Sequence, residues 1–496
     1  MKLREISWAL AVALLFCVTA TYAQDQKQDS QQPDPNGPIQ PINSGLGGAY
    51  GQKPAPAARG VSSAFDSQPY DPSQVTPDPN TLAGAEFFSV GSLEHSHNIF
   101  DPSISLSQLG ETINVANGQS NLTAVSLLGG SLNFNRTWSR YHLTTIYDGG
   151  ETFDIGQNNA GVGSSHYPFH NLIFTQEADW ARWHVLLRDD FMAAPGAAFT
   201  GTGMGGPGLV AQFSSMVGVA LNNLAQTFLP AETIETGNAM RYRNAVLGQA
   251  EYSLSRRSAF TFSGSYGLLH FSDAGYVSSR MMDAQAGYDY ILDPMNSVAI
   301  LASYGKIDYT GAGVPTSDST TDYMAALAYG RKVTGRLAFQ VAAGPQEIHS
   351  TGAVGGFQHL LWSVNSALTY DRRRSGVSFS YLRGLTAGSG VFLGATSNTF
   401  AGSAHYQFTR FWTGTVNGGY ALNNSLVPAG TASTNFDNWF VGANLGRVIG
   451  PHIGLNFNYG LQRQNTSGVC PVTSCGISGF QQTFGMTVNW HLRPAG

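Results

Sequence analysis

The chain has 496 residues, of which 11% are charged, and its formal net charge is −5. This small charge argues against an extended nucleic-acid-binding surface, and a mean hydropathy just below zero excludes a bundle of transmembrane helices. The charged fraction lies far below the roughly 25% that is usual for soluble domains, while the 59 glycines and the 11% of aromatic residues are high. Such a composition is found in disordered chains, in prion-like tracts and in proteins whose exterior does not face water.

Residues 1–23 have the features of a secretory signal peptide. A basic start (MKLR) is followed by an apolar run from Trp8 to Val18 and by small residues before Gln24. The run is shorter than the ~20 residues that span a membrane, so an uncleaved helical anchor is the less favoured alternative. We therefore expect the chain to leave the cytoplasm.

Two segments precede the first strand. Residues 24–80 are rich in Pro, Gln, Asp, Ser and Gly and poor in apolar side chains, which predicts a disordered tether. Residues 81–102 are more apolar and are expected to form a short segment at the mouth or rim of the following domain. His95 and His97 would share one face of a strand there, but two ligands alone are a weak metal signal, and surface histidines are favoured.

Residues 103–492 are predicted to be a succession of β-strands. In the stretch SGFQQTFGMTVNWHL (478–492), one face carries Phe484, Met486 and Val488 and the other carries Thr487 and Asn489, because successive side chains of a strand point to opposite faces. The same alternation of apolar and polar residues recurs along residues 453–461. Each such strand has one apolar and one polar face.

Short and long connections alternate through the second half of the chain. Tight turns fall at Thr334-Gly335, at 372–374 and at Gly450-Pro451, and polar connections such as TGAGVPTSDST and TAGSGVFLGATS lie between these hairpins. Hairpins are also expected around 122–148, 166–192 and 240–270, with a first strand near 103–112. The count is about 18 strands, with 16 as the alternative.

This pattern resembles that of the bacterial outer-membrane β-barrels, porin-like in size, over residues 103–492. The resemblance implies an all-β, transmembrane, antiparallel barrel with short periplasmic turns and longer extracellular loops. It places residues 24–80 and 81–102 in the periplasm. It also implies contact with outer-membrane lipid and with the barrel insertion machinery, and it leaves a homo-oligomer open. One feature departs from the family. Many such barrels end on an aromatic residue, whereas here the last aromatic residue, Trp490, is followed by HLRPAG.

Charged residues within the strands should face the lumen, because charges on the lipid side would cost a few kcal/mol each near the midplane. They could set a field across a pore, or they could form ion pairs that stabilise the interior. The candidates for lining or constricting the pore are Arg182, Arg188, Arg241, Arg243, Glu251, Asp283 and Asp289.

The connection at residues 193–238 is the longest in the chain. It begins Gly- and Ala-rich, and apolar residues at helical spacing predict an amphipathic helix over 208–229. General porins fold the corresponding loop into the barrel, so the resemblance implies a constriction or plug. A helix capping the outer mouth is the alternative.

Cys470 and Cys475 lie close together in CPVTSC, and in an exported protein they favour a disulfide over a zinc site, for which no further ligands are visible. No cofactor, metal site or enzymatic motif is apparent. The favoured function is a porin-like channel for passive diffusion of small polar solutes. The alternatives are a structural or interaction barrel without a conducting pore, and a dedicated transporter for one substrate class such as glycans.

Overall fold

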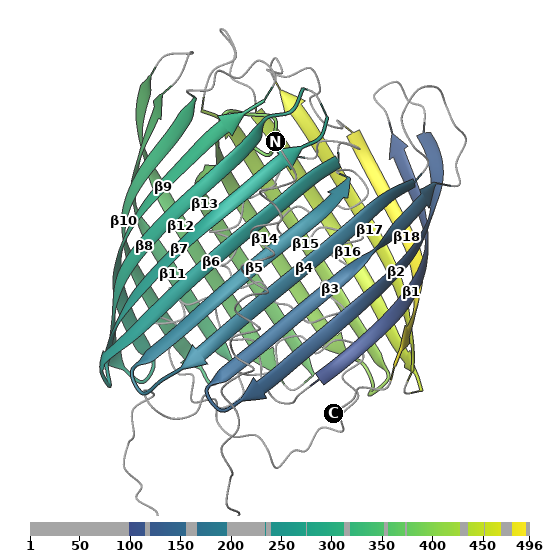
Figure 1. Cartoon of the computed structure of the whole chain (residues 1–496), viewed down its shortest axis with the longest axis horizontal. Coiled ribbons are helices and arrows are strands. Elements are labelled where there is room, and N and C mark those ends of the chain that lie inside the picture. The colour runs from purple at the N-terminus through teal and green to yellow at the C-terminus, as the bar shows by residue number, and fades with distance from the viewer. Residues whose placement is uncertain are drawn as a thin grey trace, which may run out of the picture. The chain divides into compact units, whose positions relative to one another are not determined.

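The computed structural model describes residues 99–114, 120–154, 166–195, 234, 240–273, 275–311, 318–351, 356–372, 374–426, 435–450, 452–467 and 479–492. These residues form one sheet of 18 antiparallel strands (Figure 1), which confirms the predicted fold class and strand number. No helix in this part of the chain is long and apolar enough to cross a membrane.

The strands are β1 (Ile99–Asn114), β2 (Ser120–Trp138), β3 (Tyr141–Asp154), β4 (His166–Asp179), β5 (Trp183–Pro195), β6 (Met240–Ser255), β7 (Ser258–Phe271), β8 (Ser278–Asp293), β9 (Asn296–Thr310), β10 (Ser319–Thr334), β11 (Leu337–Thr351), β12 (Phe357–Arg372), β13 (Ser375–Thr386), β14 (Ala395–Gln407), β15 (Trp412–Ser425), β16 (Asn435–Ile449), β17 (Ile453–Ser467) and β18 (Gly479–His491). The first strand begins at Ile99 rather than at residue 103.

The sheet closes because β1 pairs with both β2 and β18. At this seam Ile104 lies opposite Trp490, and the hydroxyls of Ser107 and Thr487 are 2.8 Å apart on the opposite face. Every strand therefore has two neighbours, and the barrel presents no open edge. The pairing joins residues from the two ends of the sequence.

The connections are segregated by length, as the sequence predicts. At one end of the barrel consecutive strands are separated by few residues, namely 139–140, 180–182, 256–257, 294–295, 335–336, 373–374, 408–411 and 450–452. At the other end the separations in sequence are longer and include 11 residues between β3 and β4, 44 between β5 and β6, and the described connection 387–394 between β13 and β14. Bacterial outer-membrane barrels have this asymmetry, with the short turns in the periplasm.

The two faces of the sheet differ in chemistry. Large apolar side chains point outward, among them Leu360 at 72% exposure and Leu327 at 67%. Small or polar side chains of the same strands face inward and are buried. On β18 the predicted orientation is confirmed, since Phe484 and Met486 are exposed while Asn489 is buried. The barrel is therefore apolar outside and polar inside.

Aromatic side chains gather on the outer face near both ends of the strands. At the short-turn end the rings of Trp183 and Tyr252 lie 4.8 Å apart, and Tyr141 contacts Trp180 edge to face at 6.4 Å. Toward the other end the exposed rings of Tyr304 and Tyr323 lie 5.2 Å apart. Such belts mark the two interfaces between hydrocarbon and water.

A carboxylate near the middle of β5 lies on the mostly apolar exterior. Asp189 lies on the outward face of β5 between Leu187 and Phe191, and its Oδ1 accepts a hydrogen bond of 2.9 Å from Nδ2 of Asn244 on β6. The amide partner partly compensates the carboxylate for the loss of water.

Replacing Leu327 with Arg tests the assignment of the outer face. Because Leu327 lies near the middle of β10 and faces outward, the change is expected to lower the free energy of unfolding in a bilayer by ~2–4 kcal/mol. The matched variant Val333→Arg, near the periplasmic end of the same strand, should cost about 0–1 kcal/mol. Denaturant titration in vesicles measures both, and equal losses would contradict the assignment.

Candidate functional site: the barrel interior

Arg188 faces the interior from β5 and is held by an acidic neighbour on the same face. Its Nε donates a hydrogen bond to Oδ2 of Asp190 at 2.7 Å, and its Nη2 donates one to Oδ1 at 3.0 Å. Both side chains are buried. A two-point contact of this kind fixes the orientation of the guanidinium group and neutralises its charge. Arg188 therefore belongs to an internal ion pair.

Arg241 and Arg243 lie one strand further on, at the extracellular end of β6. In the sheet they are beside Ala194 and Met192 of β5, and Arg241 is only 1% exposed. Alternation along β6 turns both guanidinium groups inward, as the sequence predicts. They place positive charge on the β5–β6 side of the interior.

Arg182 is not brought together with these arginines. It lies in the turn at 180–182, is exposed, and donates from Nη1 to the hydroxyl of Tyr252 at 3.5 Å. The strand begins only at Trp183, so the alternation that turns Arg188 inward does not extend to Arg182. We leave Arg182 out of the interior set.

Asp283 forms an acidic pair with a residue that the sequence analysis did not single out. Asp283 on β8 and Asp322 on β10 approach each other across Gly305 of β9, where a Cβ would collide with the Asp322 carboxylate. Ser265 Oγ donates to Asp283 at 3.2 Å, and Gln346 Nε2 donates to Asp322 at 2.8 Å. Glycine at 305 is therefore what allows two carboxylates to lie side by side.

Glu251 and Asp289 belong to a second acidic group, nearer the short turns. Glu251 lies opposite His184 in the β5–β6 pairing, and His184 Nδ1 is 2.6 Å from Oδ1 of Asp179. Thr261 Oγ1 donates to Asp289 Oδ2 at 3.3 Å. The predicted acidic residues are thus divided between two levels of the barrel. Among the described residues, no three or more His, Cys, Asp or Glu side chains are arranged to hold a metal ion.

The connection between β13 and β14, residues 387–394, folds into the barrel. Ala387 packs with Met281 of β8 and with Ile307 and Tyr309 of β9, which all face inward. Phe392 meets Phe436 of β16 edge to face, with 5.2 Å between ring centroids. The inserted loop 387–394 thus reaches inner walls on both sides of its own hairpin.

Backbone geometry explains how so short a segment turns inward. Gly388, Ser389 and Gly390 all have positive φ, at 80°, 53° and 81°, a conformation that glycine adopts without strain. The carbonyl of Gly390 accepts a bond of 2.8 Å from the amide of Val277, and a Cβ on Gly390 would collide with the ring of Phe271. The loop is therefore docked against the wall at β7 and β8.

The sequence predicts a constriction elsewhere, in residues 193–238. Most of that connection lies outside the described residues, including the predicted helix at 208–229. Ile234 is described and is buried against Val391 and Phe392 of the inserted loop. The predicted disulfide between Cys470 and Cys475 also lies outside the described residues.

The inward fold of this loop is not predicted from the sequence, because TAGSGVFLGATS resembles the other polar connections. Its signal was an apolar triplet, Val391-Phe392-Leu393, flanked by glycines on both sides. Such a triplet needs an apolar surface to cover it, and in a barrel with a lipid-facing exterior the loop can find one by turning inward.

The closed sheet, its apolar exterior with aromatic belts and its polar interior define a bacterial outer-membrane β-barrel of porin-like size. No protein-family model and no curated protein matches the sequence.

The chain is similar to several solved structures, at low sequence identity. OccAB3 of Acinetobacter baumannii is 9% identical with a TM-score of 0.39, over 79% of this chain and 99% of that one. OccK2 (OpdF) of Pseudomonas aeruginosa is 8% identical with a TM-score of 0.39, over 79% and 98%. A BenF-like porin from Pseudomonas fluorescens Pf-5 is 10% identical with a TM-score of 0.38, over 79% and 98%.

Replacing Gly390 with Val is expected to release the inserted loop from the wall. The new side chain combines an unfavourable positive φ with a collision against Phe271. We expect larger and noisier single-channel currents in a planar bilayer, with the barrel still folded. Gly335→Val serves as the control, because a Cβ at this turn position meets nothing within 4 Å. Unchanged currents for Gly390→Val would show that the loop does not limit conduction.

Proposed function

We propose that this protein is an outer-membrane channel through which small polar solutes diffuse passively. The observation that carries the proposal is a polar, charged inner wall, enclosed by an apolar exterior and crossed by the inserted loop 387–394. The loop narrows the path, and the charged residues of the inner wall on either side of the loop attract or repel the solute. The proposal assigns no catalytic step to the chain.

Part of the charge on the inner wall is separated by strand. Arg241 and Arg243 stand on β6, while Asp283 and Asp322 stand on β8 and β10. Carboxylates outnumber arginines on the inward face: Asp148, Glu177, Asp179, Asp190, Glu251, Asp283, Asp289 and Asp322 stand against Arg188, Arg241 and Arg243. Rings and rows of carboxylates in a pore favour cations, so we expect the channel to pass cations more readily than anions.

The remaining sequence-based predictions concern other segments of the chain and its protein partners. A signal peptide at 1–23, a periplasmic tether at 24–80, recognition by the insertion machinery and a homo-oligomer stay predictions. None of them is needed for diffusion through the barrel.

The direct test is conductance of the purified full-length chain in a planar bilayer. Stepwise current increments are expected as single barrels insert, because a continuous polar path carries ions. A correctly folded barrel that stays electrically silent would favour a structural or interaction role and would sink the proposal.

Charge reversal on β6 tests the role assigned to the wall. In the double variant Arg241→Glu and Arg243→Glu, the reversal potential under a KCl gradient is expected to shift further toward the potassium potential, because positive charge is removed from the inner wall. The control is Arg331→Glu, since Arg331 is exposed on the outward face of β10. Equal shifts in both variants would mean that the inner wall does not set selectivity.

A further inference from the structure

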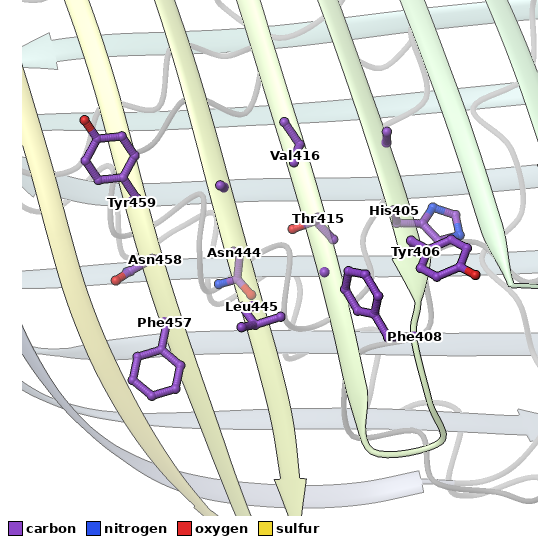
Figure 2. Close-up of a pocket in the computed structure, with 13 residues that line it drawn as sticks. His405, Tyr406, Phe408, Thr415, Val416, Asn444, Leu445, Phe457, Asn458 and Tyr459 are labelled. Atoms are coloured by element: carbon purple, nitrogen blue, oxygen red, sulfur yellow. The ribbon is translucent and has the colours of Figure 1, made fainter.

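A groove with a volume of about 440 Å3 opens in the barrel wall at β14–β17, toward the short-turn end (Figure 2). Outward-facing side chains of four neighbouring strands line most of it. The small residues Ala404, Gly414 and Ala443 line it together with aromatic side chains such as Phe457 and Tyr459. The surface exposed to the groove is almost entirely apolar.

Strand register explains why the wall is hollow here. In one row across the sheet Ala404 pairs with Val416, which pairs with Ala443, which pairs with Tyr459. In the next row Gly414 lies between Tyr406 and Leu445. Small and large side chains therefore alternate along the first row, and its small members, Ala404 and Ala443, leave a depression between bulky neighbours.

Phe408 forms the lower border of the groove. A Cβ on Gly414 would lie 2.7 Å from the ring of Phe408, so this ring leans over the glycine. The ring belongs to the turn at 408–411, which lies at the periplasmic end of the barrel. The groove is thus at the depth of the periplasmic leaflet.

Positive charge stands at the lower end of the groove. Arg447 follows Leu445 on the outward face of β16, and its guanidinium lies 5.2 Å from the ring centroid of Trp412. Arg410, in the turn that carries Phe408, lies 4.6 Å over the ring of Phe411. Both arginines are exposed, and within the described part of the chain neither has a carboxylate in ion-pair distance.

An apolar groove with two cations at one end matches the chemistry of one amphiphile. Acyl carbon buries favourably against Ala443, Phe457 and Tyr459. A phosphate group accepts hydrogen bonds from a guanidinium group, and arginines just outside the hydrocarbon region attract anionic head groups. The periplasmic leaflet is where such molecules lie.

We propose that this groove binds an anionic phospholipid of the periplasmic leaflet, with an acyl chain over Ala443 and the phosphate at Arg410 and Arg447. The site is separate from the interior, and the inference holds whether or not the barrel conducts. The bound lipid would fill the hollow between β14 and β17 and stabilise this part of the wall.

The test uses the full-length protein in a neutral detergent, with thermal unfolding followed by the change in gel mobility. Added dioleoylphosphatidylglycerol is expected to raise Tm more than dioleoylphosphatidylcholine, which has the same chains and no net charge. The double variant Arg410→Glu and Arg447→Glu should lose this difference. Ala443→Trp, which fills the groove, should lose the response to both lipids.

Matched controls place the same changes elsewhere on the outer face. Arg331→Glu and Ala302→Trp lie on β10 and β9, and both should respond to phosphatidylglycerol as the unaltered protein does. Native mass spectrometry should show one retained phosphatidylglycerol per barrel, absent from the arginine double variant. The proposal would be overturned if both lipids raised Tm equally, or if the control variants lost the response to phosphatidylglycerol as the groove variants do. It would also be overturned if native mass spectrometry showed a second copy of the chain and no retained lipid.

Discussion

Main-chain hydrogen bonding is the constraint on which the rest of this structure depends. The hydrocarbon interior of a membrane offers no water, so each N–H and C=O group must find a partner within the protein. A sheet meets this requirement only when it closes, and here the closure is made by pairing β1 with β18. The outward apolar residues follow from the position of that closed wall in hydrocarbon.

Closure also gives the interior its character. Since alternate side chains of each strand point into the barrel and away from the hydrocarbon, polar residues are placed inside, where they can contact one another. Arg188 meets Asp190, and Asp283 meets Asp322 across a glycine. The inserted loop adds apolar contacts within this polar space, because Val391 and Phe392 are covered there by Phe436 and Ile234. The outer face of the wall therefore contacts lipid, while its inner face encloses a polar space through which a solute can pass.

Sequence reasoning succeeded where the signal is local. Alternation along a strand and turn residues at its ends are properties of neighbouring residues, so the strand number, the orientation of β18 and the inward placement of Arg241 and Arg243 were all predictable. The position of Arg182 was harder, because the inward pattern of β5 stops at a strand boundary, and such boundaries are the weakest part of a sequence-based assignment.

Contacts between distant residues were not predictable in the same way. Alternation turns both Asp283 and Asp322 inward, but their approach depends on Gly305 of the strand between them. The inserted loop likewise depends on Phe271 and Tyr309, which lie far from it in the chain. An apolar triplet between glycines indicates that a loop must be covered, without saying which wall will cover it.

The seam between β1 and β18 has a consequence for how the protein is made. Its paired residues, such as Ser107 and Thr487, come from opposite ends of the barrel sequence, so the pairs across this seam have the largest chain separation among the described strands. Contacts of this kind form slowly, because the loop that they close carries a high entropic cost. Until β18 has been synthesised, β1 can complete no such seam, and both edges of a growing sheet remain open to other chains. A barrel closed in this way has to be kept from aggregating throughout its synthesis and export.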